Sequence, residues 1–186
     1  VTALGDPALL ERVSSAVVAL REFYKTLEAG RGELTRAQFV MGWTAAFDVS
    51  ASEAAEVFDR FDGQQDGSLD ALEFTHSLPL EEVPSLVRKC RHRGPLYLSA
   101  LSRDEVEAFG NMMRRLDAIS ELAWQLGVRL MVDAEHTYFQ PCIDQAVLRL
   151  QRKYNGSYPA VFNTYQAYLI DCNERLTADL ERARRE

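Results

Sequence analysis

Two short apolar segments, each placed between amphipathic helices, constrain the fold of this chain more than any other feature of its sequence. Residues 102–125 repeat apolar side chains at helical spacing, and Gly127 stands where a helix commonly ends. The elements expected after it are a strand at 128–133, a helix at 140–154, a strand at 160–166 and a helix at 168–185. A helix between two strands returns the chain to the same end of a sheet, so this order predicts parallel strands joined by a right-handed crossover. We therefore expect an α/β fold in this half of the chain.

Polar side chains follow both predicted strands. Asp133 and Glu135 come at the end of the first strand, and Gln166 ends the second. The carboxyl ends of parallel strands meet at one edge of a sheet, where α/β proteins build their sites. We expect a functional site here, with capping of the following helix as the structural alternative for the two carboxylates. His136 has no partner at a suggestive spacing, so a structural role is expected for it.

Residues 1–80 show helical periodicity without a strand-like run. The expected helices cover about 9–27, 36–47 and 50–61, followed by a short helix that ends near Pro79. Gly30 and Gly32 break the first helix. Ser50 or Ser52 begins the third, because a hydroxyl group there can accept the unpaired amides of the first turn. Helices are therefore predicted for most of this part of the chain.

Residues 62–73 match the twelve-position loop of a calcium-binding EF-hand. The residues at ligand positions 1, 3, 5, 7, 9 and 12 are Asp62, Gln64, Asp66, Ser68, Asp70 and Glu73. Gly67 stands at position 6, where the chain takes a conformation that is costly for other residues. Gln64 replaces the usual Asp or Asn and lowers the ligand charge. Two interpretations remain open: a Ca²⁺ site, or a helix pair of EF-hand shape that no longer binds metal.

A second segment of similar pattern lies thirty-five positions upstream, at residues 27–39, with Phe39 in place of Phe74. Gly32 and Leu34 match loop positions 6 and 8. Positions 1, 3, 5 and 12 hold Leu27, Ala29, Arg31 and Gln38. Because none of these four is a carboxylate, we expect a silent packing partner for the second loop. The expected core anchors around the second loop are Phe58, Phe61 and Phe74.

Residues 78–95 contain three prolines and the basic run 88–93, without a consistent periodicity. We interpret this stretch as a linker whose basic run is solvated. Contact between the basic run and the acidic helical module is the alternative.

The overall charge and composition exclude several classes of protein. A formal net charge of −7 argues against nucleic-acid binding, which needs clustered Lys and Arg to neutralise phosphates. Three widely spaced cysteines indicate neither a disulfide framework nor a thiolate zinc site. No apolar run is long enough to span a bilayer, and the first residues do not resemble a targeting peptide.

Two long motifs lie in the second half of the chain: Gly-Val-Arg-Leu-Met-Val-Asp-Ala-Glu-His-Thr-Tyr-Phe-Gln-Pro at 127–141 and Val-Phe-Asn-Thr-Tyr-Gln-Ala-Tyr-Leu at 161–169. With them, the stretch 112–186 resembles the mitochondrial proline dehydrogenases of eukaryotes, and residues 1–5 are similar to the end of that family's first barrel strand. The resemblance implies part of a (β/α)8 TIM-type barrel, strand–helix units 1 to 3, with an inserted all-α EF-hand pair. The expected domains are 1–20 for the end of the first strand and its helix, 21–80 for the EF-hand-like pair, 81–101 for the linker and 102–186 for the further strand–helix units.

The same resemblance implies FAD-dependent oxidation of L-proline to 1-pyrroline-5-carboxylate, with electrons passed to a quinone. It places the protein in the mitochondrial matrix or peripherally on the inner membrane. Gln166 matches the glutamine that touches the isoalloxazine ring, Asp133 matches the aspartate that supports the substrate pocket, and Glu135 belongs to the same motif. The family's first-strand lysine, its later strands and its substrate-binding arginine pair have no counterpart here, since Arg184 and Arg185 fall on the third helix. We therefore expect the chain alone not to turn over proline.

Two other interpretations stay open. The 4-hydroxyproline dehydrogenases share the Asp-Ala-Glu-x-Thr and Asn-Thr-Tyr-Gln patterns, although the inserted helical pair and the sequence Phe-Gln-Pro at 139–141 favour proline as the substrate. In the other interpretation the chain is a binding module in which Ca²⁺ regulates or stabilises the fold and the barrel segment is only a scaffold.

Overall fold

The computed structural model describes residues 5–77, 81–133 and 136–185, most of them in helices. Glu135 and Pro79 lie outside the described residues. The chain divides into two compact units, one made of residues 12–107 and the other of residues 1–11 with 108–186. Among the described helices, none combines the length and the apolar character needed to cross a membrane.

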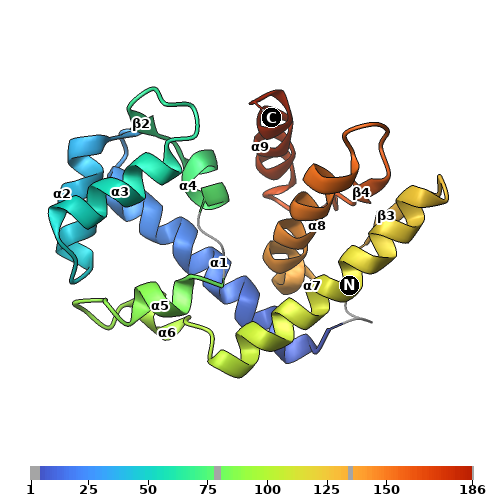
Figure 1. Ribbon diagram of the computed structural model, residues 1–186, viewed down its shortest axis with the longest axis horizontal. Coiled ribbons are helices and arrows are strands. Elements are labelled where there is room, and N and C mark those ends of the chain that lie inside the picture. Colours follow the sequence, from blue (N-terminus) through green and yellow to red (C-terminus); the bar gives the residue numbers. More distant parts are fainter. Residues whose placement is uncertain (1–4, 78–80, 134–135, 186) are drawn as a thin grey trace. The chain divides into compact units, whose positions relative to one another are not determined.

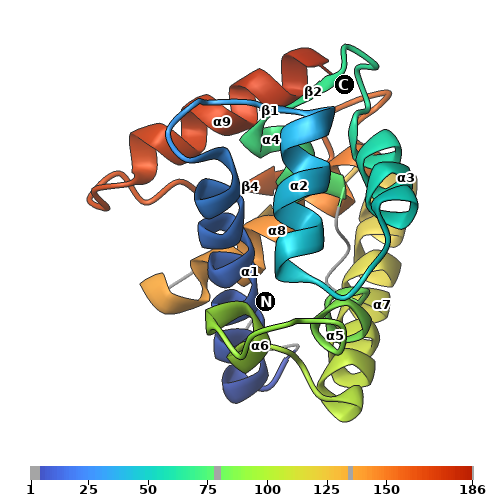
Figure 2. The ribbon, with the colours of Figure 1, turned by 90° about the vertical axis from the view of Figure 1, so that its left-hand side faces the viewer.

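Residues 12–107 form a helical unit in which α2 and α3 lie side by side (Figure 1, Figure 2). Its elements are α1 (Pro7–Glu28), β1 (Leu34–Thr35), α2 (Arg36–Ala46), α3 (Ala51–Phe61), β2 (Ser68–Leu69), α4 (Ala71–Ser77), α5 (Val83–Val87) and α6 (Pro95–Leu98), with α1 beginning among the residues of the other unit. The helices predicted at 9–27, 36–47 and 50–61 are confirmed. Strands β1 and β2 pair antiparallel with Leu34 opposite Leu69, so the loops 27–38 and 62–73 are joined at their centres.

The helix ends follow from local chemistry. Of the two serines considered for the start of α3, Ser50 is the cap: its hydroxyl accepts the Glu53 amide at 3.2 Å, and the Glu53 carboxylate accepts the Ser50 amide at 2.8 Å. These reciprocal bonds pair two amides that the helix itself leaves unpaired. After the end of α1, Gly30 and Gly32 have φ angles of +78° and +86°, which glycine adopts at little cost.

An aromatic cluster forms the core of this unit. The side chains of Phe39, Trp43, Phe47, Phe58, Phe61 and Phe74 are all 2% exposed or less. The rings of Phe39 and Trp43 stack with centroids 4.8 Å apart, and Phe61 meets Phe74 edge to face at 5.7 Å. Each buried aromatic side chain removes a large apolar surface from water. The three phenylalanines expected to anchor the second loop are therefore core residues, as predicted.

The segment 81–101 differs from the linker that its composition suggested. It contains α5 and α6, and Val83 and Val87 are buried. The basic run is not simply solvated: the Arg91 guanidinium donates to the carbonyls of Thr44 and Phe47 at 3.0 and 3.1 Å, and Lys89 pairs with Glu53 at 3.5 Å. The last carbonyls of a helix have no partner within it, so the carboxyl end of α2 attracts a cation. The basic side chains of residues 88, 89 and 91–93 are exposed to solvent, and Arg91 and Lys89 also make the contact with the acidic module that was the alternative interpretation.

The other unit has α/β character. Its elements are α7 (Arg103–Gln125), which starts among the residues of the helical unit, then β3 (Leu130–Val132), a 3-10 turn at Thr137–Phe139, α8 (Gln140–Tyr154), β4 (Val161–Asn163) and α9 (Cys172–Arg185). Strands β3 and β4 are parallel, with Leu130 opposite Val161 and Val132 opposite Asn163, and α8 forms the connection between them (Figure 1). The predicted parallel pair is confirmed.

Two boundaries in this unit differ from the expectation. Both strands are three residues long, and the last helix begins at Cys172 instead of residue 168. After Asn163 the chain is held by side-chain hydrogen bonds and by turns, such as the one closed by the Leu169 amide and the Gln166 carbonyl at 3.0 Å. These bonds take the place of the strand pairing and the helix that were expected here. Gly127 does end α7 as predicted, with φ of +67° and a bond from the Val128 amide to the Ala123 carbonyl at 2.9 Å.

Candidate functional site

The side chains of Asp133 and Gln166 meet at the carboxyl ends of β3 and β4. Asp133 follows the last paired residue of β3, and the Gln166 amide donates from Nε2 to its Oδ1 at 3.0 Å. The Asp133 side chain is exposed, whereas Gln166 is half-buried. The structure thus brings together, by one charge-assisted hydrogen bond, two of the three residues predicted for the strand-end site.

The rest of the predicted motif is only partly described. Glu135 lies outside the described residues. The His136 imidazole stacks on the Tyr138 ring with centroids 5.3 Å apart and meets the Phe139 ring edge-on at 5.6 Å. Phe139 is buried at the start of α8. These aromatic contacts agree with the structural role expected for His136.

The residues between β4 and Gln166 are also held by their side chains. Asn163 donates from Nδ2 to the Asp144 carboxylate on α8 at 2.9 Å, and Thr164 donates to the Val132 carbonyl of β3 at 2.9 Å. The Tyr165 hydroxyl donates to Asp179 of α9 at 2.7 Å. Burial raises the pKa of Tyr165, and the neighbouring Asp179 raises it further, so this hydroxyl stays protonated and remains a donor. Four consecutive side chains, from Asn163 to Gln166, therefore fix this rim.

Asp144 is the residue that the sequence reasoning missed. It is 4% exposed on α8, and besides Asn163 it receives a hydrogen bond from Gln140 at 2.8 Å and an ion pair from Arg175 at 3.1 Å. A charged residue is rarely this buried unless it is paired. The sequence did hold a signal for it: Gln140 and Asp144 are four residues apart on the predicted helix and so share one face. A carboxylate on the apolar face of a helix is buried on folding and therefore needs a cation as its partner.

In the loop 62–73, Gly67 has the positive φ angle that its position was expected to require. Gly67 has φ of +82°, and the Asp62 carboxylate accepts the amides of Asp66 and Gly67 at 3.2 and 2.9 Å. Glu73 reaches across the loop and accepts the amides of Gln64 and Asp70 at 3.2 and 3.3 Å. The carboxylates thus bind amides of the loop itself. Within residues 5–77, 81–133 and 136–185, no three His, Cys, Asp or Glu side chains are grouped so that they could hold a metal ion.

Tyr24 connects the two loops from α1. Its hydroxyl lies 2.9 Å from the Leu69 carbonyl and 3.2 Å from the Gly32 carbonyl, one acceptor in each loop. Its pKa is raised chiefly by burial and then by the negative charges of nearby acids, with Asp70 first among them. The same negative potential that keeps this hydroxyl protonated favours a cation near the loops.

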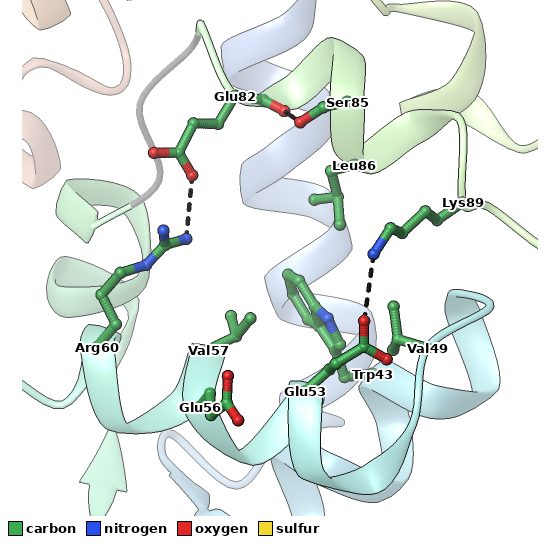
Figure 3. Close-up of a pocket in the computed structure, with 10 residues that line it drawn as sticks. All are labelled: Trp43, Val49, Glu53, Glu56, Val57, Arg60, Glu82, Ser85, Leu86 and Lys89. Carbon is green, nitrogen blue, oxygen red and sulfur yellow. Dashed lines mark hydrogen bonds and ion pairs between the residues drawn. The ribbon is translucent and has the colours of Figure 1, made fainter.

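A groove of about 500 Å³ lies between α3 and the α5 segment (Figure 3). Trp43 and Leu86 are among its apolar lining residues. Two ion pairs connect its sides, Arg60 to Glu82 at 3.1 Å and Lys89 to Glu53 at 3.5 Å. All four of these charged side chains are about half-exposed, so the pairs contribute little to stability. The groove is large enough for a small molecule but contains none of the predicted site residues.

Comparison with known families identifies one match that covers most of the chain. The family model described as "Proline dehydrogenase" matches residues 24–186. No solved structure matches the chain.

Comparison with curated proteins gives relatives of two names. The chain is 36% identical over 199 residues to "Proline dehydrogenase 1, mitochondrial" of Caenorhabditis elegans, and the alignment includes 100% of this chain and 32% of that protein. It is 33% identical over 198 residues to the protein of the same name from Homo sapiens, and this alignment includes 100% of this chain and 33% of that protein. It is 40% identical over 86 residues to "Hydroxyproline dehydrogenase" of Xenopus laevis, an alignment that includes 46% of this chain and 18% of that protein. The chain thus spans about a third of the length of the first two relatives.

Proposed function

This chain belongs to the proline dehydrogenase family, and from that membership we propose that the protein containing it oxidises L-proline to 1-pyrroline-5-carboxylate with FAD as cofactor and a quinone as electron acceptor. The relatives named as mitochondrial support a mitochondrial location, either in the matrix or attached peripherally to the inner membrane. In this proposal β3 and β4 are the second and third strands of a (β/α)8 barrel, and residues 21–80 are an inserted EF-hand pair. The observation that carries it is the hydrogen bond between Gln166 and Asp133 at the shared rim of two parallel strands.

The chemistry of this rim fits a flavin site. FAD, when bound, would accept the hydride that proline loses. The Gln166 amide carries both N–H donors and a carbonyl, the complement that the polar edge of an isoalloxazine ring requires. Asp133 holds that amide in one orientation and places a negative charge where a cationic pocket group or the substrate ammonium could be oriented. Glu135, from the same motif, is proposed to assist at this rim.

The choice between two substrates has a direct test. The relatives named hydroxyproline dehydrogenase from Xenopus laevis and Rattus norvegicus match only 46% and 47% of this chain, whereas the proteins named proline dehydrogenase 1 of Caenorhabditis elegans and Homo sapiens match all of it. This coverage favours proline. The experiment is a comparison of kcat/KM for L-proline and 4-hydroxyproline with the full-length protein. Proline is expected to be preferred, and a preference for 4-hydroxyproline would reject the substrate assignment.

As a second function we propose that the loop 62–73 binds Ca²⁺. In its favour are the ordered series of oxygen-bearing residues, the positive φ of Gly67 and the negative potential around Tyr24. The proposed ligands are Asp62, Gln64, Asp66, Ser68, Asp70 and Glu73. Glu73 would first have to leave the two amides that it accepts, and Gln64 adds no charge, so we expect a Kd of about 10⁻⁵ M or weaker.

Isothermal titration of the intact chain with Ca²⁺ tests this second function. Heat that saturates at one ion per chain is the expected result. A folded chain that gives no heat would leave the loop as a structural helix connection without a metal.

A further inference from the structure

Asp144 lies at the centre of a buried polar network in the α/β unit. Its Oδ1 accepts Gln140 and Asn163 at 2.8 and 2.9 Å, and its Oδ2 accepts Arg175 at 3.1 Å. The exposed fractions of the Asp144 and Arg175 side chains are 5% and 10%. Removing two charges from water is costly, and a buried ion pair often stabilises a fold no better than apolar residues of the same volume. Helix packing alone therefore does not account for this network.

The network also leaves polar atoms unpaired. Within the described residues, the buried Oδ1 of Asn163 and Nη2 of Arg175 have no hydrogen-bond partner in the protein. A buried polar group without a partner destabilises a fold by about 1–3 kcal/mol. A network that destabilises the fold in this way is consistent with a role in holding the Asn163 side chain in one position.

What the network holds is the end of β4. Asn163 is the last paired residue of this strand, opposite Val132. Within the part of the chain that the structure describes, strand pairing of β4 ends at Asn163, yet three residues later the Gln166 amide reaches Asp133. The bond from Asn163 to Asp144 fixes the point from which this short segment starts. The side chains of Thr164 and Tyr165 in this segment are also held by hydrogen bonds. A shift at Asn163 would therefore be transmitted to Gln166.

We propose that Asp144, held by Arg175, is a positioning residue that sets the place of the Gln166 amide through Asn163. The catalytic meaning of this placement rests on the proposed function, in which Gln166 contacts the flavin. The influence of Asp144 passes through the Asn163 side chain, which donates to Asp144 at 2.9 Å and lies three residues before Gln166.

The test breaks the link without leaving a buried charge unpaired. Asn163→Leu keeps a side chain of similar shape and removes the bond to Asp144, which still has Gln140 and Arg175. The readout is the NMR cross-peak between the Gln166 side-chain amide protons and the β-protons of Asp133, measured on the intact chain. We expect this cross-peak to be lost in N163L. If N163L does not fold, Asn163→Ser, whose side chain is too short to reach Asp144, carries the same test.

Two further variants separate positioning from general damage. Asp144→Asn combined with Arg175→Gln removes both charges but keeps an acceptor for Asn163, so the cross-peak is expected to remain. Asp117→Asn breaks a different link to α8, from Asp117 to Lys153 at 2.8 Å, and is expected to leave the cross-peak unchanged. A cross-peak that persists in a folded N163L or N163S chain would overturn the proposal, as would its loss in D117N.

The same variant in the full-length protein distinguishes this inference from the proposed function. A misplacement of about 1 Å can lower turnover about 100-fold, so N163L is expected to reduce kcat for proline by about that factor with a smaller change in KM. Loss of the cross-peak with unchanged turnover would uphold the positioning by Asp144 and refute the flavin role of Gln166. Unchanged turnover together with an unchanged cross-peak would refute the positioning alone.

Discussion

Gln166 donates a hydrogen bond to the Asp133 carboxylate, and the effect of losing this bond on the rate of the proposed reaction can be estimated. A hydrogen bond to a charged group contributes about 1.5–3 kcal/mol, and each 1.4 kcal/mol corresponds to tenfold in rate. We therefore expect Gln166→Leu to lower kcat/KM for proline roughly 10- to 100-fold in the full-length protein. Gln125→Leu, at the end of α7, is the matched control and should leave kcat/KM unchanged. Equal rates for Q166L and wild type would remove Gln166 from the site.

Cys142 is the most buried of the three free cysteines. Its thiol is fully buried on α8, and burial raises its pKa to about 12, so almost no thiolate forms at pH 8. We expect a thiol-specific reagent at pH 8 to modify Cys172 well before Cys142. Denaturant should abolish the difference. Mass spectrometry of peptides from the modified chain assigns each site, and equally fast labelling of Cys142 in the folded chain would contradict the burial of α8.

At the level of single residues, the sequence predicted the contacts that follow from strand order and missed those that depend on three-dimensional packing. Asp133 and Gln166 could be paired in advance because each ends a predicted strand and the two strands were expected to be parallel. The link from Asp144 to Arg175 joins residues 31 apart on two different helices, and no periodicity connects them. A buried charge can be suspected from its apolar neighbours, but its partner is chosen by the packing of the helices.

The start of α3 offers a prediction in which two neighbouring serines act as test and control. Ser50 accepts the Glu53 amide, whereas Ser52 is an exposed residue in the first turn. Loss of an N-cap hydroxyl destabilises a helix by about 1 kcal/mol. Ser50→Ala should therefore lower the free energy of unfolding by about 1 kcal/mol, and Ser52→Ala should change it by less than about 0.5 kcal/mol. Urea denaturation measures both, and similar losses for the two variants would place the cap elsewhere.

The start of α7 gives a prediction about pH. Glu105 accepts the Ser102 amide at 2.7 Å and pairs with Arg12 at 3.1 Å. Its pKa is lowered, first by the Ser102 amide and then by the Ser102 hydroxyl and Arg12. A depressed carboxyl pKa stabilises the fold above the unfolded value of about 4.3, and this stabilisation is lost as the pH falls through the folded pKa.

We therefore expect Glu105→Gln to lower the free energy of unfolding at pH 7 and to have a much smaller effect at pH 3. The difference at pH 7 should be on the order of 0.5 kcal/mol, because the Glu105 side chain is partly solvated. Denaturation curves at the two pH values measure it. The neighbouring exposed Glu107→Gln is the control, and an effect of E105Q that is the same at both pH values would contradict the role of the carboxylate.

Among the elements, helices were predicted more accurately than strands and connections. The helices at 36–47, 50–61 and 140–154 recur within one residue at each end, because apolar spacing and, in α2 and α3, the hydroxyl caps Thr35 and Ser50 determine them locally. The strands are shorter than predicted because their polar ends bond through side chains. The contacts that Arg91 makes within the basic run 88–93 could not be predicted, because its partners are helix-end carbonyls distant in sequence, which composition does not show.

At the scale of the whole molecule, the division into an all-α part and an α/β part could be predicted, since each has its own pattern of periodicity. The boundaries could not be placed as closely: the helical unit includes residues 81–107, which composition alone presented as a connector and the start of a helix. Short helices with prolines have weak periodicity, and their membership in a unit is decided by buried contacts such as those of Val83 and Val87.

The stability of the chain in calcium tests the proposed ion-binding function, because a ligand that binds only the folded state raises the free energy of unfolding. At a concentration of 100 times Kd the increase is about 2.7 kcal/mol. We expect Ca²⁺ to raise the melting temperature of the chain relative to a chelator, and we expect Glu73→Gln to abolish this rise because it removes a bidentate ligand. Glu33→Gln, in the first loop, retains every proposed ligand and should behave as the wild type. The chain carries a formal charge of −7, so any cation could stabilise it weakly, and equal rises in E73Q and wild type would show general charge screening instead of a bound ion.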